Sequence, residues 1–143
     1  MAIAVKRVYD PPSRKDGTRV LVDRLWPRGL TKKEAALDAW LKDLAPSNDL
    51  RSWAHAHPES WAMFRQRYLK ELAQPEASEA LQELYRLASQ RKRLALLYAS
   101  KNEEHNNAVV LKDLLDGMKK PPTGTGPASA GATRIRKAAR RPA

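Results

Sequence analysis

The 143-residue sequence contains no cysteine. Without cysteine there is no disulfide framework, no thiolate nucleophile, and no cysteine ligand for a zinc ribbon or an iron–sulfur cluster. The sequence also lacks any apolar run near the roughly 18 to 20 residues that a membrane span requires, and it reaches Lys6 and Arg7 too early for a secretory signal. We therefore expect a cytoplasmic protein with no membrane partner.

The motifs that define common catalytic sites are missing as well. There is no phosphate-binding glycine loop, no nucleophile with a recognisable base, and no set of metal ligands. His55 and His57 are two positions apart, whereas zinc enzymes use two histidines spaced by four on a helix. We expect no metal site and no cofactor, and the sequence alone does not decide between an enzyme and a binding protein.

Positive charge is what the chain has in excess, with a formal net charge of +11. Seven basic and no acidic residues lie within positions 119–143, among Pro, Gly, Ala, Ser and Thr. Residues 1–118 therefore hold 20 basic and 16 acidic residues, a net charge of only +4. Because residues 119–143 have no apolar residue larger than Ile135 to bury, we expect a single domain over residues 1–118 followed by a disordered basic tail with weak, nonspecific affinity for nucleic acid.

Hydrophobic patterns in residues 1–118 predict both strands and helices. Apolar, β-rich runs indicate strands over residues 3–9, 20–25 and 94–99. Helical spacing of apolar residues indicates helices over residues 31–46, 76–90 and 103–116, a short helix after Ser47 and a longer one between Pro58 and Pro75. We expect an α/β domain with a small, mainly parallel central sheet of about three strands surrounded by about five helices, although the link between the first two strands is short for a parallel crossover.

The helix expected over residues 31–46 depends on two local patterns. Thr31 and Glu34 have the spacing of a capping box, and Pro46 would end the helix. Between them an apolar stripe recurs at helical spacing, with Leu37, Trp40, Leu41 and Leu44 as its members. The same argument assigns four aromatic residues to the core: Trp40, Trp61, Phe64 and Tyr68.

Polar side chains gather where the predicted strands end. In a parallel sheet, ligands bind at the carboxyl ends of the strands, and helices beginning near Thr31 and Asn102 would direct free amides to the same edge. We therefore predict a pocket there for an anionic small molecule that carries a phosphate or a carboxylate. The candidate catalytic residues are Asp23 and His105, and the candidate ligand-binding residues are Arg24, Trp26, Arg28, Lys42, Arg51, Lys101 and Asn106.

The chemistry of each side chain suggests its role in such a pocket. Arg24 and Arg28 can clamp a phosphate or carboxylate through two parallel hydrogen bonds, and a lysine adds a point charge. Trp26 can stack on a planar ligand. Asp23 and His105 can transfer protons.

Three other interpretations stay open. The end of the second strand can be a structural ion pair beside a packed Trp-Pro corner, because ion-pair networks also order charged groups. The chain can be a nucleic-acid accessory protein that uses its basic tail. It can also be a noncatalytic interaction module, monomeric or homodimeric, whose helical Trp and Leu faces bind a partner.

Long blocks of the chain also carry a family resemblance. They are residues 6–11 (KRVYDP), 17–29 (GTRVLVDRLWPRG), 40–47 (WLKDLAPS), 50–53 (LRSW), 97–101 (LYASK) and 105–111 (HNNAVVL). Over about residues 3–116 the chain resembles the YeaO-like family of uncharacterised bacterial proteins. The resemblance implies a small cytoplasmic α/β domain and brings no established activity. The family commonly has an aspartate where this chain has Asn102, so the resemblance supports no acid–base role at that position.

Overall fold

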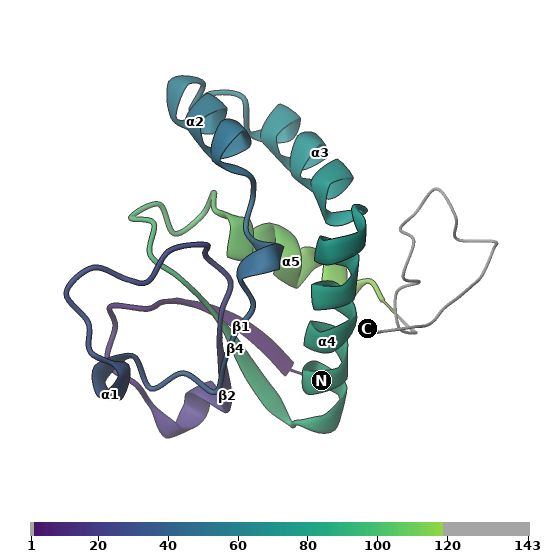
Figure 1. Cartoon of the computed structure of the whole chain (residues 1–143). Coiled ribbons are helices and arrows are strands. Elements are labelled where there is room, and N and C mark those ends of the chain that lie inside the picture. The colour runs from purple at the N-terminus through teal and green to yellow at the C-terminus, as the bar shows by residue number, and fades with distance from the viewer. Residues whose placement is uncertain (1, 119–143) are drawn as a thin grey trace.

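The computed structural model describes residues 2–118, and its central feature is a four-stranded sheet in the order β1-β4-β2-β3 with parallel pairing throughout (Figure 1). The strands are β1 (Ala2–Arg7), β2 (Thr18–Leu21), β3 (Ala39–Trp40) and β4 (Arg93–Tyr98). The α-helices are α1 (Lys32–Ala35), α2 (Asn48–Ala56), α3 (Trp61–Leu72), α4 (Pro75–Gln90) and α5 (Asn107–Asp116), and two short 3-10 helices are η1 (Arg14–Asp16) and η2 (Lys42–Leu44). The predicted α/β class is confirmed, with four strands within residues 2–118 instead of about three.

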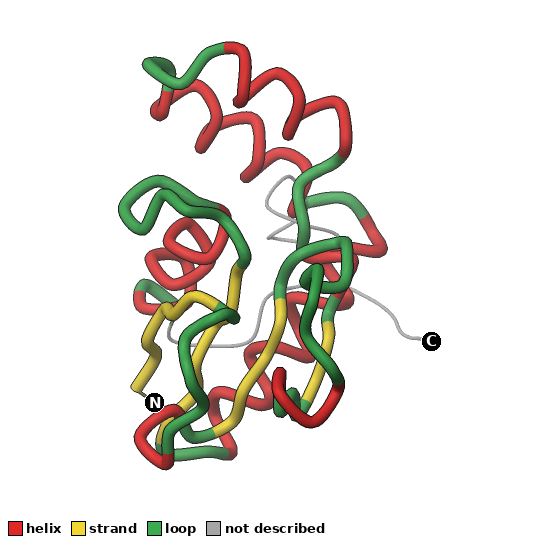
Figure 2. Tube along the Cα trace, turned by 90° about the vertical axis from the view of Figure 1, so that its left-hand side faces the viewer, coloured by secondary structure: helices red, strands yellow, loops and turns green. Residues whose placement is uncertain are grey.

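The two faces of the sheet are covered differently. One face carries Val20, Leu94 and Leu96, which pack in the main core with buried residues of α2, α3, α4 and α5. The opposite face carries Leu21 and Leu97, which form a smaller cluster covered by the turn after β1 and by residues from 30 to 40. This burial on both faces explains why the segment before residue 99 is apolar without alternation. The α2–α3 hairpin extends beyond one end of the sheet (Figure 2).

The helix predicted over residues 31–46 is wrong beyond its first turn. The predicted capping box forms, but α1 ends at once because Ala36 adopts a left-handed backbone conformation with a φ of 49°. The Asp38 carboxylate then accepts a hydrogen bond from the Arg19 amide at 2.8 Å, and the chain runs alongside β2. Trp40 pairs with Leu21 in β3. Residues 39 and 40 therefore pair with the edge of β2, although the local spacing of their apolar side chains favours a helix.

This change of element also divides the apolar stripe. Leu44 enters the main core, whereas Leu37 and Trp40 pack against the smaller cluster on the other face of the sheet. Trp40 is only half-buried, so its assignment to the core is met in part. Phe64 and Tyr68 are buried in the main core as predicted.

A link of only ten residues, 8–17, joins β1 to β2 on the far side of β4. An extended chain of that length reaches about 33 Å, more than the roughly 20 Å of a six-residue strand, so the crossover needs no α-helix. Gly17 has a φ of 68°, and a Cβ atom there would lie 2.3 Å from the Arg93 carbonyl oxygen. The short parallel connection therefore depends on a glycine at the point where the link meets β4.

A largely buried cluster of charged side chains holds this link against β1 and β2. The Asp16 carboxylate accepts hydrogen bonds from Lys6 at 3.0 Å, from the Ser13 amide at 2.9 Å and from Arg19. Arg19 also donates to the Ala35 carbonyl at 2.8 Å. One carboxylate and two cations thus hold η1, β1, β2 and the end of α1 together.

The last helix begins at Asn107, four residues later than predicted. Asn106 is its N-cap and accepts a hydrogen bond from the Val109 amide at 3.0 Å. Before it, the Asn102 side chain accepts two backbone amides in a turn, at 3.0 and 2.9 Å. The predicted disordered tail, residues 119–143, lies outside the described residues. No helix within residues 2–118 is long and apolar enough to cross a membrane.

Candidate functional site

Asp23 lies just beyond the carboxyl end of β2 and joins three elements. Its carboxylate accepts hydrogen bonds from the Ala99 amide at 2.8 Å and from the Asn107 side-chain amide at 3.2 Å, and its carbonyl accepts the Trp40 indole N–H at 2.7 Å. Burial raises the pKa of Asp23, while these two carboxylate hydrogen bonds and the charge of Arg51 oppose that rise. The carboxylate therefore connects β2 to the end of β4 and to the start of α5.

A polar layer that was not predicted lies beneath Asp23. Asn107 is buried and also donates to the Val22 carbonyl at 2.9 Å. The Tyr68 hydroxyl donates to the Leu44 carbonyl, and burial together with the nearby negative charge of Asp23 raises the pKa of Tyr68 well above its usual range. The sequence offers one clue to this role of Asn107: a side-chain amide directly follows the helix cap Asn106 and precedes the apolar residues of α5. Its partner Asp23 is 84 positions away in the sequence.

Three of the predicted cationic residues surround this end of β2. Arg24 donates to the Ala45 carbonyl at 3.3 Å, and the Lys42 ammonium lies 4.1 Å from the centre of the Trp40 ring. Arg51 is close enough to Asp23 for its charge to lower the pKa of that carboxyl. Arg24, Lys42 and Arg51 are exposed, and none of them forms a salt bridge with a carboxylate of the described residues.

Trp26 and Arg28 belong to the turn that follows. The Trp26 indole donates to the Leu30 carbonyl at 2.7 Å, and its ring packs in a T-shaped arrangement with that of Trp40, the ring centres 5.4 Å apart. The Arg28 carbonyl accepts the Tyr9 hydroxyl at 2.9 Å, while the Arg28 side chain is exposed. These contacts give Trp26 the geometry of a packed corner, one of the alternatives that the sequence left open.

The predicted site residues that follow β4 are held differently from those that follow β2. His105 stacks on Trp61 with ring centres 4.4 Å apart and planes 7° from parallel, which joins the loop after β4 to the start of α3. Asn106 uses its oxygen as the helix cap and donates to the Asn102 carbonyl at 2.9 Å. Lys101 is exposed. Among residues 2–118, no hydrogen bond or ion pair joins His105 or Lys101 to Asp23.

Helix amides contribute less to this edge than the sequence indicated. α1 has only four residues, and its capping box already uses the Thr31 and Glu34 amides. At α5, the caps formed by Asn102 and Asn106 satisfy three more amides. Cationic side chains, rather than helix amides, are therefore what this edge offers to an anion. No group of three or more His, Asp or Glu side chains in the described part of the chain could hold a metal ion.

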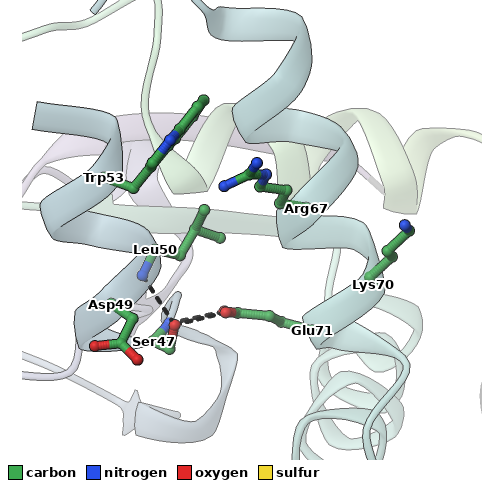
Figure 3. A pocket seen from close by; sticks show the side chains of 7 residues that line it. All are labelled: Ser47, Asp49, Leu50, Trp53, Arg67, Lys70 and Glu71. Carbon is green, nitrogen blue, oxygen red and sulfur yellow. Dashed lines mark hydrogen bonds between the residues drawn. The ribbon is translucent and has the colours of Figure 1, made fainter. Parts of the chain in front are cut away.

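A groove between α2 and α3 was not predicted (Figure 3). On one side, the Ser47 amide donates to the Glu71 carboxylate at 2.8 Å, and the Ser47 hydroxyl donates to it at 2.5 Å. On the other, the Arg67 guanidinium lies 4.4 Å from the centre of the Trp53 ring, whose stack with His57 has a centre spacing of 4.5 Å. The groove is lined by Ser47, Asp49, Leu50, Trp53, Arg67, Lys70 and Glu71. Glu71 and Trp53 are already engaged with neighbouring groups, so the groove is a helix-packing feature more than a prepared site.

Curated proteins similar to this chain are described as uncharacterised. The uncharacterised protein YeaO of Escherichia coli K12 is 50% identical over 120 residues, which are 82% of this chain and 100% of YeaO. The uncharacterised protein Rv3073c of Mycobacterium tuberculosis H37Rv is 41% identical over 115 residues, 80% of this chain and 94% of that protein. The uncharacterised protein Mb3100c of Mycobacterium bovis is similar to the same extent. No solved structure matches the chain.

The sequence profile of one protein family covers most of the chain. It matches residues 2–130 and therefore extends twelve residues beyond the part that the structure describes. Its description reads "Inactive DUF488-N3 subclade". Together with the identity to YeaO, this match confirms the resemblance seen in the sequence blocks. The chain belongs to this family, the inactive DUF488-N3 subclade.

Proposed function

We propose that this protein is a small binding domain that holds an anionic small molecule, bearing a phosphate or a carboxylate, at the carboxyl end of β2. We call the group formed by Asp23, Arg24, Lys42 and Arg51 the edge site. The single observation that carries the proposal is that the three cations of the edge site are exposed and form no salt bridge with a carboxylate of residues 2–118. Cations gathered without salt bridges favour an external anion.

The donors at the edge site support this proposal. A guanidinium group has five N–H donors, and the only hydrogen bond of the Arg24 side chain within residues 2–118 is the one to the Ala45 carbonyl. Lys42 rests on the face of Trp40, which positions its ammonium group without neutralising it. Two guanidinium groups and one ammonium can thus surround a phosphate or carboxylate. Arg28 and Lys101, both exposed, add to the positive potential around this edge.

The environment of Asp23 favours binding over catalysis. Its two carboxylate oxygens accept hydrogen bonds from Ala99 and Asn107. In the proposal Asp23 therefore holds the end of β2 against β4 and α5 and does not transfer protons. His105 is stacked on Trp61, and Asn106 serves as a helix cap. The family description, an inactive subclade, supports the same noncatalytic role.

A titration with inorganic phosphate, and in parallel with acetate, tests the edge site. We expect saturable changes in the amide NMR signals of residues 23, 24, 42 and 51. Replacing Arg51 or Arg24 by alanine removes a charge-assisted contact, so each variant should weaken binding about tenfold, which corresponds to about 1.4 kcal/mol.

Arg65→Ala is the matched control. Arg65 lies on α3 and forms no salt bridge with the described residues, so this variant removes the same charge away from the edge site and should keep the wild-type affinity. Absence of saturable binding by both anions, or an equal loss in the Arg65 variant, would show that the edge site is not an anion site.

A further inference from the structure

We propose that the amino end of the sheet, opposite the edge site, carries a second binding surface that contacts the phosphate backbone of a nucleic-acid duplex. We call this surface the amino-edge patch. Its side chains are all exposed, and none forms a salt bridge with a carboxylate of residues 2–118. The amino-edge patch consists of Arg14, Lys15, Arg91, Lys92 and Arg93.

The fold brings two distant segments together to form the patch. Arg14 and Lys15 lie on η1, whereas Arg91 and Lys92 form the turn between α4 and β4 and Arg93 is the first residue of β4. Gly17, next to η1, packs so closely on Arg93 that no Cβ atom fits between them, and the Ala2 amide donates to the Lys92 carbonyl at 3.2 Å. Figures 1 and 2 both show η1 and the α4–β4 turn at the same end of the molecule. Five cations from two segments therefore share one surface.

The one acidic residue of η1 does not offset this charge at the surface. Asp16 is only 8% exposed, and its carboxylate is already hydrogen-bonded to Lys6 and Arg19 beneath the sheet. The exposed residues of η1 are the two cations beside it, Arg14 and Lys15. The fold thus sorts the charges of this segment, with the carboxylate inside and the cations outside.

The chemistry of the patch favours a duplex backbone over other polyanions. The exposed large apolar residues of the described chain are Tyr9, Leu25 and Met63, and all three lie in other segments. A membrane-surface site combines cations with apolar side chains that enter the bilayer, and a protein interface needs an apolar centre. Single-stranded nucleic acid is bound largely by stacking of its bases on aromatic rings, which the patch also lacks. Guanidinium and ammonium groups alone contact phosphates without reading sequence.

The test measures binding of the full chain to a short DNA duplex of mixed sequence by fluorescence anisotropy at several salt concentrations. Each phosphate contact contributes about −0.9 to the slope of log K against log salt. The double variant Arg91→Ala/Lys92→Ala should therefore reduce the magnitude of the slope by about 2. A control double variant, Arg65→Ala/Lys70→Ala, has the same net charge but changes α3 and should keep the wild-type slope.

Thermal unfolding of both variants comes first, because cations after α4 also interact favourably with the carboxyl end of that helix. Residue 15 provides an independent check: Lys15→Ala, on the other segment, should reduce the magnitude of the slope by about 1 without altering the α4–β4 turn. Equal slopes in the two double variants would overturn the proposal, since net charge alone would then explain binding. Binding to vesicles containing phosphatidylserine but not to the duplex would overturn it as well.

Discussion

At the scale of single residues, two carboxylates illustrate how different surroundings shift a pKa in opposite directions. Burial raises the pKa of Asp23, and the hydrogen bonds from Ala99 and Asn107 only partly oppose it. Burial would also raise the pKa of Asp16, but hydrogen bonds from the Ser13 amide and from two cations outweigh burial and lower it below the ordinary value. Asp16 is therefore an ionised structural anchor, whereas Asp23 sits where ionisation is less favourable.

Replacing Asp16 by asparagine should destabilise the fold by about 3 kcal/mol, because Arg19 would be left buried without its charged partner. The ordinary pKa of the carboxyl is 3.8 and its folded-state pKa is lower. The ionised group thus stabilises the fold above pH 3.8, and this contribution is lost as the pH falls through the folded-state pKa. Urea unfolding between about pH 5 and pH 2 should show that the advantage of the wild type over the variant shrinks toward acid.

Asp113→Asn, at an exposed position of α5, is the control for this measurement. It should leave the free energy of unfolding within about 0.5 kcal/mol of the wild type. A wild-type advantage over Asp16→Asn that stays constant across this pH range would contradict the assignment of Asp16 as an ionised partner of Lys6 and Arg19.

At the scale of elements, the end of α1 decides the topology of this half of the sheet. Thr31 and Glu34 start a helix as predicted, but the left-handed Ala36 turns the chain toward β2, where Trp40 pairs with Leu21. Local spacing alone favours a longer helix, and strand pairing overrides it. The indole of Trp40 then reaches the carbonyl of Asp23, so this break is also what brings Lys42 to the edge site.

Ala36→Gly should stabilise the protein by about 1 kcal/mol, because glycine adopts the left-handed conformation without the steric cost that alanine has there. Gln66→Gly, at an exposed position in the interior of α3, should instead destabilise the protein by about 1 kcal/mol. Chemical unfolding of both variants compares the two backbone conformations directly. If Ala36→Gly destabilises the protein as much as Gln66→Gly does, residue 36 does not have the left-handed conformation and α1 does not end there.

At the scale of the whole molecule, the sequence predicted the helices and strands that have a strong local pattern of apolar or capping residues. The apolar run at residues 94–99 identified β4, the run at residues 20–25 located only the end of β2, which stops at Leu21, and Ser47 caps α2 as expected. The sequence could not show β3, because two residues have no periodicity and their pairing comes from the neighbouring strand. The grouping of Arg24, Lys42 and Arg51 as ligand-binding residues stays a prediction, and in the fold Arg24 reaches the Ala45 carbonyl, Lys42 the Trp40 ring and the charge of Arg51 the Asp23 carboxyl. The sequence analysis missed Asn107, whose role depends on a contact across the fold.

The distribution of charge also has to be considered over the whole chain. The tail holds seven basic residues and no acidic one, and the amino-edge patch adds five cations that the overall count for residues 1–118 conceals. If both act on the same duplex, phosphate contacts of the full chain should give a salt slope of up to about −11, of which up to about −6 belongs to the tail. The two contributions can be separated, because one is removed by truncation and the other by substitution.

Deleting residues 119–143 should therefore reduce the magnitude of the slope by up to about 6 and leave a residual slope of about −4 to −5 from the patch. Residues 2–118 contain the entire sheet and both apolar clusters, so circular dichroism of the truncated chain should match that of the described fold. Salt-dependent anisotropy on the same duplex provides the measurement, with Arg91→Ala/Lys92→Ala introduced into both chains. Because the two sets of charges are separate, the double variant should lower the slope by about 2 in each chain; an effect confined to the full chain would mean that the patch binds nucleic acid only through the tail.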